Sequence, residues 1–136
     1  MYKKILVPLG GPTLDDRLLR HVADLALAVG AEVLLLRVAH YHTRDAQAHE
    51  VEEAQEYLEH AQAKMEADGV RATTIVRHGE PVQEIVSLAE SSGADLIAMG
   101  THGHSELKHL LVGSVAEGVL RATTIPVLFV KPHGTA

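Results

Sequence analysis

The apolar residues of this chain fall into short continuous runs separated by longer segments with a different periodicity. The runs lie at 5–7, 33–38, 72–76, 95–99 and 125–130. Continuous apolar runs of this length are typical of strands that are buried on both faces of a sheet. The run at 72–76 is richer in threonine, as expected for a strand near a sheet edge. The pattern therefore predicts five short strands.

The segments between these runs carry apolar residues at helical spacing. They predict helices over 18–29, about 46–68 and 82–89. A fourth predicted helix starts near Ser114 and has Val115, Ala116 and Val119 on its apolar side. Glycine follows each of the first three, as is common at helix ends. The longest helix has a polar, glutamate-rich face, which we expect to lie in water. Its predicted apolar stripe consists of Val51, Ala54, Leu58, Ala61 and Met65.

Two sequences fit the capping box, in which a Ser or Thr side chain and an acid three residues later satisfy the first backbone donors of a helix. They are Thr13 with Asp16, and Ser114 with Glu117. Pro81 stands where a first helical residue is expected, because proline is well tolerated there. These signals predict where three of the helices begin.

The alternation of strands and helices indicates one α/β domain over residues 1–136, with a parallel sheet covered by helices on both faces. Sheets of this Rossmann-like kind bind ligands beyond the carboxyl ends of their strands, where the strand order reverses. In the order 3-2-1-4-5, the first and fourth strands flank that crevice. The segment 8–12 and the segment 100–114 would then line it.

A glycine-rich segment follows the fourth predicted strand. Gly100 and Gly103 are three residues apart, and Gly113 with Ser114 then opens a helix. Glycine lets backbone N–H groups approach an anion, and the start of a helix favours negative charge. The spacing therefore indicates a phosphate-binding loop, although ordinary turn chemistry remains the alternative explanation.

Composition restricts the partners that such a site can have. The formal net charge of −6 has the wrong sign for broad attraction to nucleic acid or to an anionic membrane. There is no cysteine and no apolar run of membrane-spanning length, and the chain starts without a signal-peptide pattern. We expect a cytoplasmic protein whose phosphate site is local. The segment 102–109 contains three histidines, one lysine and a single acid, Glu106.

The ten histidines raise the question of a metal site. His40 with His42 and His102 with His104 are close pairs, but no closed ligand set such as His-Glu-x-x-His is present, so we predict no metal site built from protein ligands. Within the glycine segment, His102 is placed to donate to phosphate, which predicts tighter nucleotide binding at mildly acid pH. No nucleophile with an adjacent base is apparent, so we predict no catalytic residues.

The chain resembles the universal stress protein family over nearly its whole length. The matching pieces are the segment 4–8, the turn 79–81, the segment 93–100, the Gly-x2-Gly-x9-Gly-Ser spacing that starts at Gly100, and the segment 125–127. The resemblance implies a five-stranded sheet of order 3-2-1-4-5. It also implies binding of ATP or another adenine nucleotide with Mg²⁺, a role in stress signalling, and no efficient catalysis.

The resemblance also assigns candidate site residues by position. Around the phosphates and ribose it implies Gly100, His102, Gly103, Gly113, Ser114 and Val115. Around the adenine it implies Pro8, Leu9, Val38 and Met99.

One position departs from the family pattern. Such proteins usually carry an aspartate after the first strand, followed by Gly and Ser, whereas this chain has Gly10-Gly11-Pro12. The missing carboxylate would accept hydrogen bonds from the ribose or base, each worth about 1.5–3 kcal/mol. A non-nucleotide protein-interaction module of the same fold is therefore the alternative function. Gly10-Gly11 is also similar to the loop of ATP pyrophosphatases, but Leu9 stands where their serine would be.

The last predicted strand, 127–130, is apolar on both faces and would lie at a sheet edge. A protein in water must cover or pair such an edge. Pairing with the same strand of a second copy would do so with two-fold symmetry, and the family resemblance also implies frequent dimers of this kind. We therefore predict a homodimer formed through the last strand.

Overall fold

A computed structural model describes residues 1–11, 14–39, 44–101 and 113–131 of the 136-residue chain. Strands and helices alternate along the sequence, as the apolar pattern predicts. The elements are β1 (Lys4–Pro8), α1 (Asp16–Val29), β2 (Glu32–Ala39), α2 (Arg44–Ala67), β3 (Ala72–His78), α3 (Pro81–Ser92), β4 (Leu96–Gly100), α4 (Ser114–Ala122) and β5 (Val127–Val130).

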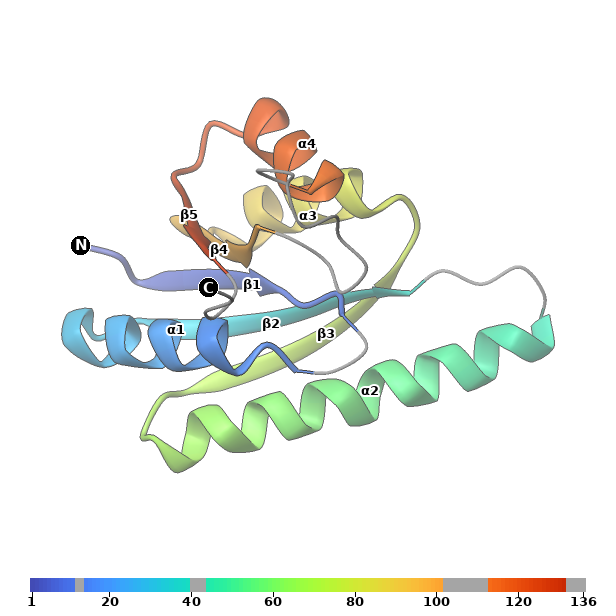
Figure 1. Cartoon of the computed structure of the whole chain (residues 1–136), viewed down its shortest axis with the longest axis horizontal. Helices are drawn as coiled ribbons and strands as arrows, with labels where there is room; N and C mark the ends of the chain where they lie inside the picture. The colour runs from blue at the N-terminus through green and yellow to red at the C-terminus, as the bar shows by residue number, and fades with distance from the viewer. Residues whose placement is uncertain (12–13, 40–43, 102–112, 132–136) are drawn as a thin grey trace.

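The strands form one parallel sheet in the order β3-β2-β1-β4-β5, which confirms the predicted order and α/β fold class. Helices α1 and α2 cover one face, and α3 and α4 cover the other (Figure 1). The chain builds the sheet outward from β1 to β3, then crosses to β4 on the other side of β1. The strand order therefore reverses between β1 and β4, which are the neighbours that sequence reasoning places at the binding crevice.

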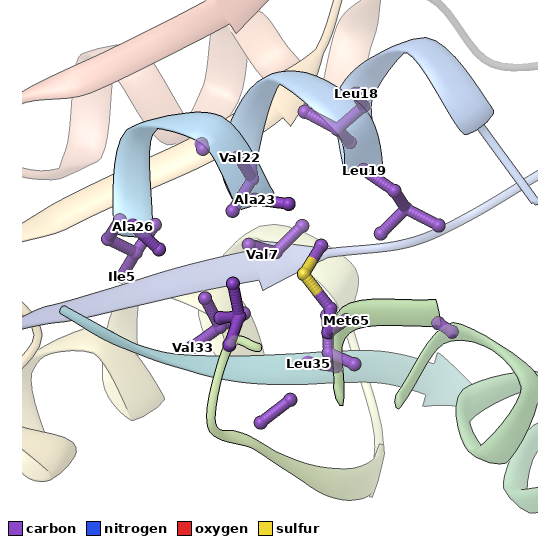
Figure 2. Close-up of a cluster of buried hydrophobic side chains, with 14 of the residues drawn as sticks. Ile5, Val7, Leu18, Leu19, Val22, Ala23, Ala26, Val33, Leu35 and Met65 are labelled. Carbon is purple, nitrogen blue, oxygen red and sulfur yellow. The ribbon is translucent and has the colours of Figure 1, made fainter. Parts of the chain in front are cut away.

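Two apolar layers sandwich the sheet. Figure 2 shows the layer beneath α1 and α2, where Val7 and Leu35 of the sheet face Val22 of α1 and Met65 of α2. The layer beneath α3 and α4 contains Leu6, Ile97 and Val119, all fully buried. Since β1 contributes to both layers, its continuous apolar run is explained.

Four of the five predicted stripe residues of α2 are buried, and the fifth is not. Ala54, Leu58, Ala61 and Met65 are almost inaccessible, whereas Val51 is 39% exposed. The amino-terminal part of α2 projects past the carboxyl ends of the strands, so it has no sheet beneath it (Figure 1). The helical period predicts which side of α2 is apolar but not where the sheet stops.

The carboxyl ends of α1 and α3 lie at the predicted glycines, whereas the amino end of α1 is not capped by the predicted residue. Gly30 and Gly93 end α1 and α3 in the left-handed conformation, with φ of 76° at both. The predicted capping box at Thr13 is wrong, because Asp15 is the N-cap of α1 and its Oδ1 accepts a hydrogen bond from the N–H of Leu18 at 3.1 Å. Pro81 is the first residue of α3, as predicted.

The last strand is shorter than its apolar run. β5 begins at Val127, two residues after the predicted start. Pro126 cannot donate a ladder hydrogen bond, although its carbonyl accepts one from the N–H of Ile97 at 3.0 Å. Proline therefore sets the first paired residue of this strand.

Helices α3 and α4 pack closely at Gly118. A Cβ atom at Gly118 would lie 2.7 Å from Cγ2 of Val82, which is too close for two carbon atoms. We expect Gly118→Ala to lower the free energy of unfolding by about 1–3 kcal/mol, because overpacking outweighs the gain in helix propensity. Denaturant unfolding measures the change. Adding Val82→Ala should restore most of the loss, and an unchanged midpoint for the single variant would contradict this packing.

Asp95 joins the amino ends of β1 and β4. Its carboxylate accepts hydrogen bonds from the backbone N–H groups of Lys3, at 2.8 Å, and Lys4, at 3.1 Å. Burial opposes ionisation of this group, but these hydrogen bonds prevail, and the pKa of Asp95 is lowered from its ordinary value.

A lowered pKa in the folded state means that the Asp95 carboxylate stabilises the fold above its unfolded-state pKa. We expect this contribution to be lost as pH falls through the folded-state pKa. Wild type should therefore exceed Asp95→Asn in free energy of unfolding at neutral pH, and the difference should shrink on acidification. Denaturant unfolding of both proteins between neutral pH and pH 3 tests this expectation; a difference that does not depend on pH would contradict it.

Candidate functional site

The sheet opens at the carboxyl ends of β1 and β4. Pairing of β1 with β2 continues to Pro8 and Leu36, and the N–H of Leu9 still donates to the carbonyl of Leu36 at 2.8 Å. Pairing of β1 with β4 ends earlier, at Leu6 and Ile97. The ends of these two central strands are therefore not hydrogen-bonded to each other, and the loops after Pro8 and Gly100 begin side by side at the point where the strand order reverses.

The two ends of the glycine motif meet at this edge. Gly100 pairs with Val130 of β5, and Thr101, only 4% exposed, donates its N–H to the carbonyl of Val130 at 3.3 Å. The carbonyl of Thr101 in turn accepts a hydrogen bond from the N–H of Gly113. This hydrogen bond joins the two ends of the segment and holds the first turn of α4 beside the end of β4.

Gly113 is the N-cap of α4, so the capping box predicted at Ser114 is wrong. Its φ of −70° and ψ of 162° are extended, and no side chain caps the helix. The carbonyl of Gly113 accepts the first helical hydrogen bond, from the N–H of Glu117 at 3.0 Å. The first N–H groups of a helix have no intrahelical partner, and a glycine at the N-cap has no side chain to accept hydrogen bonds from them. This arrangement suits a ligand that accepts hydrogen bonds and carries negative charge.

Ser114 and Val115 form the exposed start of α4. Ser114 is exposed, and Val115 is 36% exposed, although the sequence pattern predicts Val115 on the apolar side. Ala116 and Val119 of the same helix are buried as predicted. The helix therefore turns the first two residues toward solvent at the carboxyl edge of the sheet, where contact with a ligand is possible.

The four residues predicted around an adenine do not all face the same side of the sheet. Val38 and Met99 pack in the layer beneath α3 and α4, whereas Leu9 belongs to the layer beneath α1 and α2. Leu9 and Met99 are only 4% and 5% exposed, while Pro8 and Val38 are half-buried. A base at this edge would therefore reach the side chains of Pro8 and Val38 more readily than those of Leu9 and Met99.

Gly10 lies in open space. It is exposed, and a Cβ atom built on it has no neighbour within 4 Å. A larger residue is accommodated here without a clash, so the absence of the usual aspartate is not dictated by packing. His102 and Gly103, the two other predicted phosphate ligands, lie outside the described residues.

Sequence reasoning missed Arg37, a half-buried residue near the end of β2. Its Nη1 atom donates to the carbonyl of Gly11 at 2.8 Å and, more weakly, to that of Leu9 at 3.5 Å. Its guanidinium carbon lies 4.1 Å from the ring centre of Tyr57 in α2. Burial raises the pKa of the Tyr57 phenol, although the charge of Arg37 acts against the shift. A lone arginine in an otherwise apolar strand was the available sequence signal.

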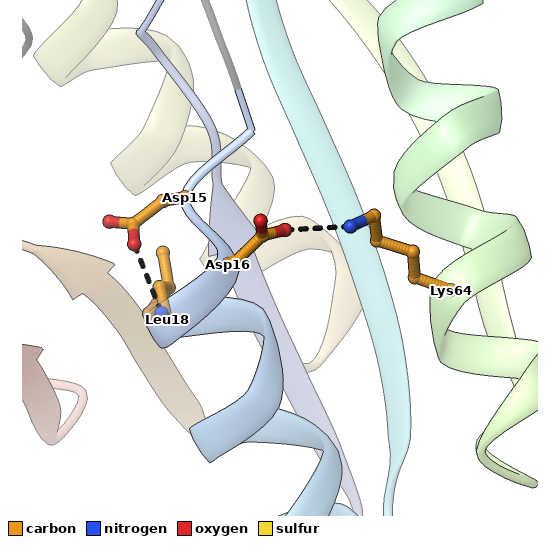
Figure 3. Close-up of polar contacts among 4 residues, drawn as sticks. All are labelled: Asp15, Asp16, Leu18 and Lys64. Atoms are coloured by element: carbon orange, nitrogen blue, oxygen red, sulfur yellow. Dashed lines mark hydrogen bonds and ion pairs between the residues drawn. The ribbon is translucent and has the colours of Figure 1, made fainter.

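The acids at the start of α1 have structural partners. Figure 3 shows Asp15 capping the helix through Leu18 and Asp16 paired with Lys64 of α2, with 2.7 Å between Oδ1 and Nζ. The described ranges contain no group of three His, Cys, Asp or Glu side chains that could hold a metal ion. They also contain no helix that is both long and apolar enough to cross a membrane.

A surface hollow of about 590 Å³ lies at the opposite edge of the sheet. It is bordered by Tyr2 and Lys3 before β1, by Gly30 after α1 and by Val70 before β3. None of the predicted site residues lines it. The backbone geometry at β1, β4 and α4 therefore defines the candidate site, and this hollow does not.

Comparisons with known proteins agree on one family. The sequence model of the universal stress protein family matches residues 1–131. The chain is 32% identical to universal stress protein MJ0577 of Methanocaldococcus jannaschii over 157 aligned residues, covering 96% of each protein. It is 33% identical to universal stress protein YxiE of Bacillus subtilis, covering 96% of this chain and 100% of that protein.

Solved structures show the same fold. The structure of MJ0577 matches with a TM-score of 0.84 and 35% identity over 99% of both chains. The universal stress protein of Archaeoglobus fulgidus, solved in complex with dAMP, matches with a TM-score of 0.76 and 25% identity over 94% of this chain and 97% of that one. The chain is a member of the universal stress protein family.

Proposed function

We propose that this chain is an adenine-nucleotide-binding module, with ATP as its ligand, whose site lies where β1 and β4 end. The observation that carries the proposal is the start of α4, where Gly113 leaves the first helical N–H groups without a side-chain cap. The contact between the two ends of the glycine motif supports it, because the hydrogen bond from Gly113 to Thr101 holds that helix start beside β4. The dAMP complex of the Archaeoglobus fulgidus relative supports the adenine part.

In this proposal the phosphates lie against the backbone of Gly100, Gly103 and Gly113, with Ser114 and His102 as side-chain donors. The ribose lies near Val115, and the adenine lies over Pro8 and Val38, with Leu9, Gly10 and Met99 contributing chiefly through their backbone. Exposed Ser114 and Val115 and half-buried Val38 are accessible to such a ligand. Glu117 in the first turn of α4 is an acid near the phosphates, and Arg121 pairs with it at 3.5 Å.

The residues present fit Mg²⁺ that arrives with the nucleotide. Mg²⁺ usually keeps several waters and is held by substrate phosphates with one or two carboxylates. The part of the chain that the structure describes offers no cluster of carboxylates for a separate site. When bound, the ion would neutralise phosphate charge, and the α4 start would orient the phosphates.

We further propose that residues 1–136 act as one cytoplasmic, regulatory domain, in which nucleotide occupancy reports cellular state during stress without fast turnover. The alternative is a protein-interaction module of the same fold, favoured by one observation, the absence of a carboxylate at Gly10. Phosphate release from ATP at enzyme-like rates would contradict the regulatory proposal.

The proposal includes a homodimer formed through β5. This strand is at the edge of the sheet, and Val127, Leu128 and Phe129 remain half-buried in the isolated chain. Pairing two copies would cover this edge. We expect the mass of a dimer in sedimentation equilibrium at micromolar concentration, and a monomer there would contradict this part of the proposal.

Mass spectrometry of the small molecules released on denaturing the purified protein tests the function. The proposal predicts ATP or another adenine nucleotide in a molar amount comparable to the protein. A protein that releases none and does not take up ATP on incubation would favour the interaction module.

A further inference from the structure

The side chain of Arg37 donates hydrogen bonds to the loop that carries Gly10. Arg37 lies on the face of β2 that is covered by α2, and its Nη1 atom donates to the carbonyls on both sides of Gly10, those of Leu9 and Gly11. The two contacts, at 3.5 Å and 2.8 Å, join the guanidinium to the backbone on either side of Gly10.

The guanidinium of Arg37 also stacks over the ring of Tyr57. The ring centre is 4.1 Å from the guanidinium carbon, and the ring itself packs against the buried layer beneath α1 and α2. No carboxylate of the described residues lies within ion-pair distance of Arg37. Within the described residues, its contacts are therefore with the loop and with Tyr57, and no ion pair there explains its position.

The loop itself has little else to define its shape. Two consecutive glycines allow many backbone conformations, so ordering them costs more entropy than ordering other residues. Within the described residues, the hydrogen bonds that hold Leu9, Gly10 and Gly11 are that of the Leu9 N–H to Leu36 and those of Arg37. Removing Arg37 would leave Gly11 without its hydrogen bond to β2.

We propose that Arg37 is a positioning residue for the nucleotide site, which holds the Leu9–Gly11 loop in its binding conformation while Tyr57 holds Arg37. This inference rests on the proposed function, since it assigns the loop to the nucleotide. In place of the carboxylate that the family resemblance implies after the first strand, the chain has a backbone loop held by a side chain from the neighbouring strand. Pre-ordering of this kind improves affinity by lowering the entropy lost on binding.

The chemistry of arginine suits this role and that of lysine does not. The planar guanidinium can donate to two acceptors and stack on a ring at the same time. A lysine ammonium is a compact, strongly hydrated charge that lacks this flat surface. The conservative variant therefore separates the stacking of the flat guanidinium on Tyr57 from charge alone.

The test compares Arg37→Met and Arg37→Lys with Arg71→Met, a control just before β3. Arg71 also loses one charge when replaced, but it is exposed beside the surface hollow at the opposite edge of the sheet. The affinity for ATP with Mg²⁺ is measured by calorimetry. The mobility of the Gly10 and Gly11 backbone is measured by amide hydrogen exchange and NMR relaxation in the absence of nucleotide.

We expect Arg37→Met to weaken ATP binding about tenfold, the effect of losing roughly one hydrogen bond to a charged group. Arg37→Lys should recover part of this loss, and Arg71→Met should bind as wild type does. Tyr57→Leu should weaken ATP binding several-fold, because the guanidinium of Arg37 loses the aromatic ring over which it stacks. The Gly10 and Gly11 amides should exchange faster in Arg37→Met than in the control.

Three results separate the inference from the function on which it rests. Equal ATP affinity in Arg37→Met and Arg71→Met would overturn the positioning role while leaving nucleotide binding intact. Weaker binding without a change at the Gly10 and Gly11 amides would also overturn it. If wild type does not bind ATP, the proposed function fails, and with it the assignment of this loop to a nucleotide; the amide measurements would then decide only whether Arg37 orders the loop.

Discussion

Replacing Ser114 with aspartate should abolish most nucleotide binding while leaving the fold intact. Ser114 is the exposed first residue of α4, so a new carboxylate there meets no packing obstacle from the core. Negative charge in the first turn of a helix is favourable by about 0.3–1 kcal/mol, so thermal stability should stay level or rise. The same charge would repel phosphates bound at the helix start, and we expect about a 100-fold loss of ATP affinity, or ~2.7 kcal/mol.

Thr124→Asp is the matched control. It makes the same change from a hydroxyl to a carboxylate at an exposed residue, but it lies between α4 and β5, at the amino ends of the strands. Calorimetric titration with ATP and Mg²⁺ should show a large loss for Ser114→Asp and none for Thr124→Asp. If both variants bind as wild type does, the start of α4 is not the phosphate site.

Replacing Gly10 with aspartate should strengthen binding. A Cβ atom at this position meets open space, and Gly10 does not adopt a positive φ, so aspartate is accommodated without strain. The new carboxylate would accept a hydrogen bond from the ribose or base that the wild-type chain cannot provide. A hydrogen bond to a charged group contributes about 1.5–3 kcal/mol, which corresponds to roughly a 10- to 100-fold gain in ATP affinity.

Gly10→Asn controls for the added size and loss of glycine entropy without adding charge. We expect Gly10→Asp to exceed both Gly10→Asn and wild type in affinity for ATP, measured under the same salt conditions. Weaker binding in Gly10→Asp than in Gly10→Asn would mean that the ligand does not approach this loop with hydroxyl or amino donors. The adenine end of the proposed site would then have to be placed elsewhere.

The strand order was expected from the family resemblance, and the composition of the apolar runs agrees with it only in part, because edge strand β5 is as apolar as central β1. β1 supplies side chains to both buried layers and is wholly apolar at Ile5, Leu6 and Val7, while edge strand β3 carries Thr73 and Thr74. The alternation with helices then leaves few topologies for a parallel sheet. The glycine spacing at Gly100 and Gly113 was also readable, because only glycine permits close backbone approach to an anion.

What sequence reasoning missed depends on contacts between distant segments. Ser114 was a good N-cap candidate by local chemistry, but the hydrogen bond of Gly113 to Thr101 moves the helix start one residue earlier. The contacts of Arg37 join β2 to a loop 26 residues before it and to a ring on α2. The close packing at Gly118 likewise depends on the approach of Val82 from α3, which the local sequence does not specify.

Calorimetric titration of the wild-type protein with ATP in the presence of Mg²⁺, after removal of any bound nucleotide, tests the central claim most directly. The proposed site predicts saturable binding of one nucleotide per chain, with an affinity stronger than millimolar, that is lost in Ser114→Asp. A wild-type protein that shows no saturable binding at millimolar ATP would contradict nucleotide binding at the start of α4 and would favour a protein-interaction module of the same fold.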